Sequence, residues 1–286
     1  MFPAVSVIVP TYNRWPMVAE AVESALEQSY RNFELIVVDD GSEDETAPNL
    51  QKYGSRIRLL RQARRGVAAA RNFGVRSSSG EYLAFLDSDD LWRPEKLKAQ
   101  VSFMAANPEL EICQTEEIWI RRGVRVNPKR RHRKPSGDIF RPSLDLCLVS
   151  PSAVMIKRAL FERVGGFDEA FPVCEDYDLW LRVAVDTPVP LMPLPLVIKR
   201  GGHADQLSHS TWGLDRFRIL ALQKLLRSAI DEEKRRWVLQ MLERKVAILA
   251  QGARKRGNES AAAGYLEILA QFHGEMNENG SEHPRI

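Results

Sequence analysis

The first 106 residues alternate short apolar runs with helix-like patterns four times. The apolar runs, each short enough to be a buried strand, cover residues 5–9, 33–38, 57–60 and 81–86. Helical patterns follow at residues 18–26, after a capping-box sequence at 42–45, at 66–75 and from Pro94 to about residue 106. Strands that alternate with helices favour a parallel sheet covered by helices, so we predict an α/β fold. Ligands bind such sheets outside the carboxyl ends of the strands.

The rest of the chain is less regular at first and then helical. A short helix is expected near Leu144, a strand at residues 153–156 and a helix at residues 157–164. From residue 211 onward, apolar residues recur at helical spacing, as in Val238, Leu242, Val246, Leu249 and Ala253. We therefore expect a main domain at residues 1–210, a helical extension at 211–275 and a flexible tail at 276–286.

The net charge of +3 is unevenly distributed along the chain. Residues 121–134 hold eight Lys and Arg and no acid, so the other residues carry 33 basic and 38 acidic side chains, a net charge of −5. A basic balance confined to one segment argues against a general nucleic-acid-binding protein. Two interpretations of the segment stay open: a mobile, solvated loop, or an electrostatic contact with an acceptor's phosphate or an anionic membrane surface.

Composition excludes several other classes of protein. A content of 44% hydrophobic and 28% charged residues is ordinary for a globular chain. The apolar stretch at residues 191–198 is shorter than the roughly 18 residues of a membrane-spanning helix and contains Pro193 and Pro195. Three cysteines without CxxC spacing indicate neither a disulfide framework nor a zinc site. With no signal-peptide pattern at the start, the expected location is the reducing cytoplasm.

Carboxylates gather directly after two of the predicted strands. Asp87, Asp89 and Asp90 follow the fourth strand, and Asp39 and Asp40 end the second. Closely spaced carboxylates repel one another, and a divalent cation such as Mg²⁺ relieves that repulsion while also binding substrate phosphates. The alternative is that these acids only cap turns and helices.

Six motifs in a fixed order identify a resemblance. They read VSVIVPTYNR, LIVVDDGSEDET, GVAAARNFG, GEYLAFLDSDDLW, GGFDE and CEDYDLWLR. Together they resemble the family 2 glycosyltransferases over residues 3–210. The resemblance implies a Rossmann-like nucleotide-diphospho-sugar transferase sheet of the GT-A type, with flanking helices. The C-terminal helical extension lies outside it.

The resemblance also implies site residues. Asp176 matches the catalytic base, with Glu175 beside it, and Asp87-Ser-Asp89 matches the Asp-x-Asp motif. The metal, Mn²⁺ or Mg²⁺, would be held by Asp89 and Asp87, with His203 able to complete its shell. Lys199 and Arg200 are placed to meet phosphate. The donor-binding residues implied are Pro10, Thr11, Tyr12, Asn13, Asp40, Gly66, Arg71, Asp87, Ser88 and Asp89.

The chemistry of glycosyl transfer accounts for two separate acidic motifs. A base takes the proton of the incoming hydroxyl, and a divalent metal stabilises the charge on the departing nucleotide diphosphate. The expected activity is inverting transfer from a nucleotide-sugar donor, most simply a UDP-sugar, to a glycan, lipid-linked or protein acceptor. Two alternatives are a non-catalytic glycan-binding module and a sugar-phosphate nucleotidyltransferase. The latter would carry a Gly-rich phosphate loop near its first strand, which residues 10–14 are not.

Overall fold

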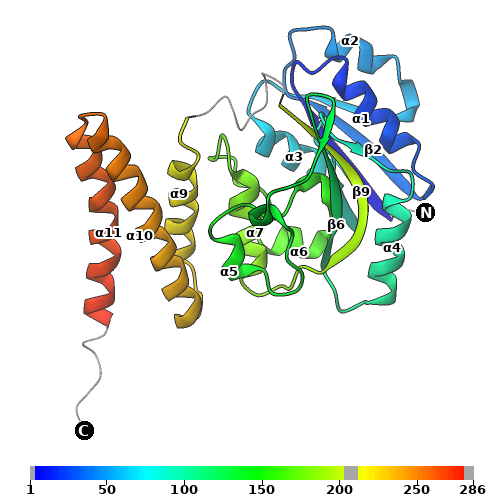
Figure 1. Cartoon of the computed structure of the whole chain (residues 1–286). Helices are drawn as coiled ribbons and strands as arrows, with labels where there is room; N and C mark the ends of the chain where they lie inside the picture. Colours follow the sequence, from blue (N-terminus) through cyan, green and yellow to red (C-terminus); the bar gives the residue numbers. More distant parts are fainter. Residues whose placement is uncertain (1–3, 203–211, 280–286) are drawn as a thin grey trace. The chain divides into compact units, whose positions relative to one another are not determined.

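The computed structural model describes residues 4–202 and 212–279, with side chains up to Phe272. The chain divides into two compact units, Met1–Trp212 and Gly213–Ile286. The boundary expected from the sequence, at residue 210, lies two residues from this division. Figure 1 shows the first unit as a sheet flanked by helices and the second as helices alone.

Four parallel strands begin the sheet of the first unit. They are β1 (Val5–Thr11), β2 (Phe33–Asp39), β3 (Arg58–Arg61) and β4 (Tyr82–Phe85). Their spatial order is β3-β2-β1-β4, and each neighbouring pair is parallel. Every residue of β1 is buried, as expected for a strand covered on both faces. The predicted parallel sheet is therefore confirmed for these four strands.

The sheet continues beyond β4 with strands that make it mixed. They are β5 (Leu91–Trp92), β6 (Ile112–Arg121), β7 (Val124–Val126), β8 (Val154–Lys157) and β9 (Leu191–Gly201). Strand β8 is antiparallel to both β4 and β6, and β9 is parallel to β6. The apolar stretch at 191–198 lies in β9, where Pro195 pairs with Glu116 at an irregularity in the register. Proline is tolerated in a strand at such a bulge.

Helices cover both faces of the sheet. They are α1 (Met17–Leu26), α2 (Thr46–Gln51), α3 (Val67–Arg76), α4 (Lys96–Ala106), α5 (Phe140–Ser143), α6 (Arg158–Arg163) and α7 (Glu175–Ala184). Val7 and Val9 belong to the same core cluster as Val22 of α1 and Leu97 of α4. On the other face, a Cβ at Gly74 of α3 would lie 2.5 Å from a methyl carbon of Ile8. Glycine therefore allows α3 to approach β1 closely.

The expected capping box at residues 42–45 is wrong. Helix α2 starts at Thr46 after Glu45, and no side chain caps it. The Ser42 hydroxyl instead accepts a hydrogen bond from the backbone N–H of Asn13, and the Thr46 hydroxyl accepts from Arg14 and Trp15. These hydroxyls serve the loop after β1, because that loop's backbone donors have no partner in the sheet.

The second unit consists of α9 (Asp215–Leu226), α10 (Glu232–Lys255) and α11 (Glu259–Asn279). The side chain of Asp231 caps α10 by accepting from Lys234 N. The stripe predicted from Val238 to Ala253 is buried. Helix α11 continues to Asn279, past residue 276 where a flexible tail was expected to begin. Within the described ranges, no helix has the length and apolarity needed to cross a membrane.

Candidate active site

The acidic loop after β4 is held in place by the hydroxyl of Ser152. Ser152 Oγ accepts from Asp87 N at 3.1 Å and donates to Asp90 Oδ2 at 2.7 Å. Asp90 is 2% exposed and also accepts from Arg200 N. Burial raises the pKa of Asp90 well above its usual range, against the attraction of Lys199. Asp87 and Asp89 are only partly buried, so Asp90 anchors the loop and the other two can meet a ligand.

A single arginine joins the two acidic motifs. Arg71 of α3 donates from Nη2 to Asp87 Oδ1 at 2.7 Å and from Nη1 to Glu175 Oε1 at 2.6 Å. Its guanidinium carbon lies 4.9 Å from the ring centre of Phe167. Burial acts to lower the pKa of Arg71, but the two carboxylates raise it above its ordinary value. The Asp-x-Asp motif and the Glu-Asp motif, 87 residues apart between Asp89 and Asp176, therefore belong to one site.

Glu175 and Asp176 differ in their surroundings. Glu175 is buried against Arg71, whereas Asp176 is partly exposed. Oδ1 of Asp176 accepts from Tyr177 N, and its Oδ2 lies 3.5 Å from the thiol of Cys147. Of the two neighbouring acids, Asp176 is the more exposed, and Glu175 is the one paired with Arg71.

The backbone before this pair is strained. Cys174 precedes α7 with φ 63°, a left-handed conformation that is uncommon for a residue other than glycine. Such strain concentrates at functional sites. Cys147 is a neighbour of Asp176 that sequence reasoning missed, because nothing in a lone cysteine 29 residues away signals the contact.

A pH-dependent stability follows from the burial of Glu175. Burial raises its pKa from 4.5 to about 7, with Asp176 adding to the shift and Arg71 opposing it. Because the folded protein binds this proton more tightly than the unfolded chain does, the free energy of unfolding falls as pH rises from 4.5 to about 7. The amide in the Glu175→Gln variant cannot ionise, so the free energy of unfolding of this variant should fall less over that interval. Urea unfolding at several pH values in the interval measures the free energy of unfolding, with exposed Glu109→Gln as control. If that free energy fell equally with pH in Glu175→Gln and in the wild type, the prediction would be contradicted.

A second cluster forms at the end of β2. Asp40 Oδ1 accepts from Gln62 Nε2 at 2.7 Å and from Arg65 N at 2.9 Å, and its Oδ2 accepts from Gly66 N at 2.8 Å. Gly66 has φ 92° and directly precedes α3. Asp40 is 4% exposed. Asp40, which is expected to meet the nucleotide base, therefore also holds the loop that leads into α3, the helix of Arg71.

The residues after β1 lie beside this cluster. Pro10 and Thr11 are buried at the end of the strand, and Thr11 is paired with Asp39. The Tyr12 ring lies 4.0 Å from the guanidinium carbon of Arg64, which also donates to the Tyr12 hydroxyl. Asn13 Oδ1 accepts from Glu43 N, at the neighbouring strand end. These residues therefore share one edge of the sheet with Asp40.

Two cations face the acidic groups. Arg14 Nη1 lies 3.6 Å from Asp89 Oδ2. Lys199 Nζ donates to Ser150 Oγ at 2.8 Å. Burial acts to lower the pKa of Lys199, but nearby carboxylates, Asp87 and Asp176 among them, raise it. Lys199 is thus within electrostatic reach of both acidic motifs. Sequence reasoning placed Lys199 near phosphate but missed the contacts of Arg14, Ser150 and Ser152, which join segments distant in the chain.

The carboxylates suit a divalent metal that a substrate helps to hold. The described residues contain no group of three or more His, Cys, Asp or Glu side chains that would form a protein-only metal cage. Mg²⁺ is commonly bound by one or two carboxylates together with substrate phosphates. Asp87 and Asp89 offer that donor set, and Ser88 between them is 9% exposed. His203, the third expected ligand, lies outside the described residues.

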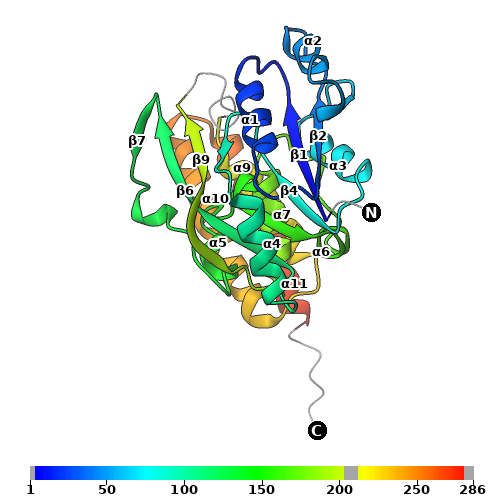
Figure 2. The ribbon, with the colours of Figure 1, turned by 90° about the vertical axis from the view of Figure 1, so that its right-hand side faces the viewer.

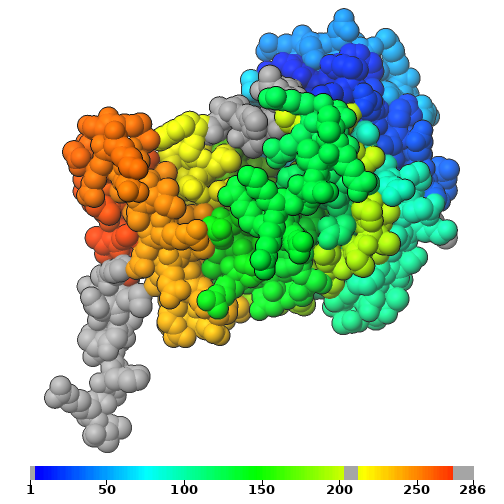
Figure 3. All heavy atoms as spheres, viewed as in Figure 1, coloured from blue at the N-terminus to red at the C-terminus, as the bar shows by residue number. Residues whose placement is uncertain are grey.

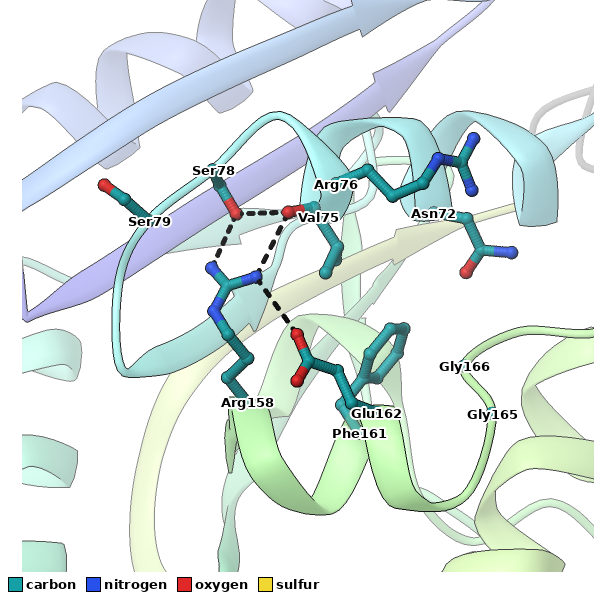
Figure 4. Close-up of a pocket in the computed structure, with 10 residues that line it drawn as sticks. All are labelled: Asn72, Val75, Arg76, Ser78, Ser79, Arg158, Phe161, Glu162, Gly165 and Gly166. Atoms are coloured by element: carbon teal, nitrogen blue, oxygen red, sulfur yellow. Dashed lines mark hydrogen bonds and ion pairs between the residues drawn. The ribbon is translucent and has the colours of Figure 1, made fainter.

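A hollow of ≈620 Å³ lies elsewhere, between α3 and α6 (Figure 4). Asn72, Ser78 and Arg158 line it, together with Gly165 and Gly166. Arg158 is committed to structure there, since it donates to the Val75 and Gly80 carbonyls and to the Ser78 hydroxyl. Ser78 precedes β4, whereas the acidic loop follows it. None of the carboxylates of the candidate site lines the hollow.

Comparison with known proteins identifies the family of the chain. A family model described as Glycosyl transferase family 2 matches residues 6–165, and one described as Glycosyltransferase like family 2 matches residues 138–221. The chain is 34% identical to an uncharacterized glycosyltransferase of Rickettsia typhi, over 63% of this chain and 58% of that protein. It therefore spans less than two thirds of that relative's length.

Another relative has a specific name. The chain is 31% identical to the Escherichia coli UDP-Glc:alpha-D-GlcNAc-diphosphoundecaprenol beta-1,3-glucosyltransferase WfgD, over 77% of this chain and 83% of that protein. Among solved structures, S. aureus TarS 1–349 in complex with UDP-GlcNAc has a TM-score of 0.73 at 19% identity, over 93% of this chain and 81% of TarS. That likeness supports the GT-A-like fold. From its sequence matches, this chain belongs to glycosyl transferase family 2.

Proposed function

We propose that the chain is an inverting, metal-assisted glycosyltransferase that moves a sugar from a UDP-sugar to an acceptor hydroxyl. The observation that carries the proposal is the Arg71 bridge between Asp87 and Glu175. Through this one buried arginine, Asp87, the carboxylate expected near metal and diphosphate, lies close to the Glu-Asp motif, which is expected to supply the base. Family membership supports glycosyl transfer as the reaction class.

The donor occupies the edge formed by the ends of β1, β2 and β4 in this proposal. Tyr12 and Asp40 lie toward the base, while Asp87 and Asp89 lie toward the ribose and diphosphate. Asp89 with Asp87 would hold Mn²⁺ or Mg²⁺, which would supply Lewis-acid stabilisation of the departing diphosphate. Lys199 adds a fixed positive charge near the same groups, because its pKa is raised above its ordinary value.

Asp176 acts as the general base. Its Oδ2 accepts the proton of the acceptor hydroxyl as the hydroxyl oxygen forms a bond to the anomeric carbon. The bond from that carbon to the diphosphate oxygen breaks with its electron pair, which leaves on UDP. Attack opposite the leaving group inverts the anomeric configuration. Glu175 keeps Arg71 oriented and is not itself the base, since its carboxylate is buried against that arginine.

The acceptor we favour is a lipid-linked glycan. WfgD is named for a UDP-Glc donor and a diphosphoundecaprenol-linked GlcNAc acceptor, and this relative supports that class over a free glycan or a protein. The enzyme would then work at the cytoplasmic face of a membrane. Cell-surface polysaccharide or lipopolysaccharide synthesis would use such a product.

A donor panel tests the proposal. UDP, GDP and dTDP sugars are titrated into the protein with and without Mn²⁺, and transfer to a lipid-linked GlcNAc acceptor is followed by release of the nucleotide. Binding of a UDP-sugar with transfer supports the proposal. Binding without transfer to any acceptor would favour a non-catalytic module. Release of inorganic diphosphate from a nucleoside triphosphate and a sugar phosphate would favour a nucleotidyltransferase.

Asp89→Asn separates metal-assisted binding from folding. The variant should lose the Mn²⁺-dependent gain in UDP affinity by at least about 10-fold, the smallest loss usual when a metal's surroundings are disturbed. Isothermal titration of UDP with and without Mn²⁺ measures it directly, independent of turnover. Asp186→Asn, at an exposed position after α7, is the matched control. An unchanged metal effect in Asp89→Asn would remove Asp89 from the metal site.

A further inference from the structure

The basic segment at residues 121–134 begins with a hairpin and is mostly exposed. Strands β6 and β7 form a hairpin in which Arg121 pairs with Val124. Its two turn residues, Arg122 and Gly123, have φ 50° and 77°, as a tight two-residue hairpin turn requires. Figure 2 shows β7 beside β6, at the far side of the sheet from β2. The segment therefore begins with a hairpin rather than a loop.

A buried ion pair fastens the returning chain to the sheet. Lys134 Nζ lies 2.9 Å from Glu117 Oε1, and the two side chains are 6% and 3% exposed. Glu117 Oε2 accepts from the indole N–H of Trp119, whose ring centre lies 5.5 Å from that of His132. Burial acts to raise the pKa of Glu117, but Lys134 and Lys199 lower it to about 2. Lys134, one of the eight basic residues, therefore anchors the segment to β6.

The other seven basic residues are exposed, and we call them the basic face. They are Arg121, Arg122, Arg125, Lys129, Arg130, Arg131 and Arg133. Among the described residues no ion pair neutralises any of them. Val124 beside the turn is 64% exposed, with Arg121 opposite it in the hairpin and Arg125 next in the sequence. Figure 3 shows the middle of the chain, in green, forming part of the surface of the first unit.

The basic face adjoins the candidate active site through one strand. In the parallel pairing of β6 with β9, Trp119 is opposite Lys199 and Ile120 is opposite Arg200. Arg200 in turn donates to the Asp89 carbonyl and the Asp90 carboxylate. Strand β9 therefore connects β6, which begins the basic face, with the acidic loop after β4.

We propose that the basic face docks the enzyme on an anionic lipid bilayer, with Val124 entering the headgroup layer. Basic residues beside an exposed apolar side chain complement a negatively charged membrane surface. Nucleic acid is a poorer match, because the Trp119 ring is covered by His132 and Arg121 rather than open to stack on a base. The inference rests on the proposed function only in that docking would bring a lipid-linked acceptor to the site.

Vesicle binding tests the proposal. The full chain is mixed with vesicles of phosphatidylcholine alone or with about 30% phosphatidylglycerol, and bound protein is measured by flotation. Wild type should bind only the anionic vesicles, and salt should weaken binding. The variant Arg122→Gln/Arg125→Gln/Arg130→Gln should bind roughly 100-fold more weakly. Lys52→Gln/Lys98→Gln/Lys255→Gln, the same change of net charge at other exposed positions, should bind like wild type.

Val124→Trp reports the contact at the hairpin tip. Its added tryptophan fluorescence should shift to the blue with anionic vesicles and not with neutral ones. Equal vesicle binding by the two triple variants, or binding to neutral vesicles, would overturn the proposal. Tighter binding to an oligonucleotide than to anionic vesicles at equal salt would overturn it as well.

Titration with a UDP-sugar in solution keeps the two proposals apart. Both triple variants should bind the donor as wild type does. Donor binding without vesicle binding rejects the docking surface alone. Vesicle binding without binding of any nucleotide sugar rejects the proposed function and leaves the docking surface supported.

Discussion

Asp176→Asn is expected to lower the rate of sugar transfer by about 10²–10⁴-fold, the usual contribution of a general base, with donor affinity unchanged. The reason is that the amide keeps the shape of the side chain and can still accept from Tyr177 N, but it cannot take up the acceptor's proton. Steady-state transfer rates and calorimetric titration of the UDP-sugar measure the two quantities separately.

The control for this substitution is Asp186→Asn, which makes the same chemical change at an exposed position after α7. It should leave transfer and donor affinity as in wild type. If Asp176→Asn weakened donor binding and transfer to the same extent, Asp176 would belong to the donor site and the base would have to be another residue. Near-normal transfer by the variant would contradict the role altogether.

Arg71→Met should damage stability and donor binding together. The apolar side chain leaves the Glu175 carboxylate buried and Asp87 without its 2.7 Å partner. Removing one partner of a buried ion pair typically costs about 3–5 kcal/mol of stability. Arg71→Lys keeps the charge but loses the planar fork that reaches both carboxylates, so it should fall between Arg71→Met and wild type. Urea unfolding and UDP titration measure these effects.

Arg76→Met on the same helix is the matched control, because its ion pair with Glu169 is long, at 3.6 Å, and its side chain is 58% exposed. An exposed pair of this kind contributes about 0–1 kcal/mol. Glu175→Gln added to Arg71→Met should restore part of the lost stability, since it removes a buried charge that has no partner. Equal stability of Arg71→Met and wild type would show that the bridge is not what holds the two motifs together.

Much of the first half of the fold was predictable from local pattern. Four short apolar runs separated by helical stripes became β1 to β4 in a parallel order. In β1, which is buried throughout, apolar residues extend along most of the strand. The carboxylates at the ends of β2 and β4 were predictable as site candidates as well. Parallel strands place their carboxyl ends at one edge.

The other half of the sheet was not predictable in this way. Strand β6 contains Gln114, Glu116 and Glu117, so it has no continuous apolar run. Its pairing with β9 joins residues more than 70 positions apart in the chain, which no local pattern signals. The capping box at Ser42 failed because a tertiary partner, the backbone of Asn13, engages its hydroxyl.

The sequence by itself determined the strand–helix alternation, the family, and the residue types at the ends of the strands. It could not show that Glu175 is buried and Asp176 partly exposed, or that residues 121–126 form a hairpin, since neighbouring residues share one local pattern. The tertiary structure decided both, because burial and partners come from elements distant in the chain. Arg71 on α3 takes Glu175 into the interior, and Glu117 on β6 holds Lys134, leaving seven basic side chains exposed.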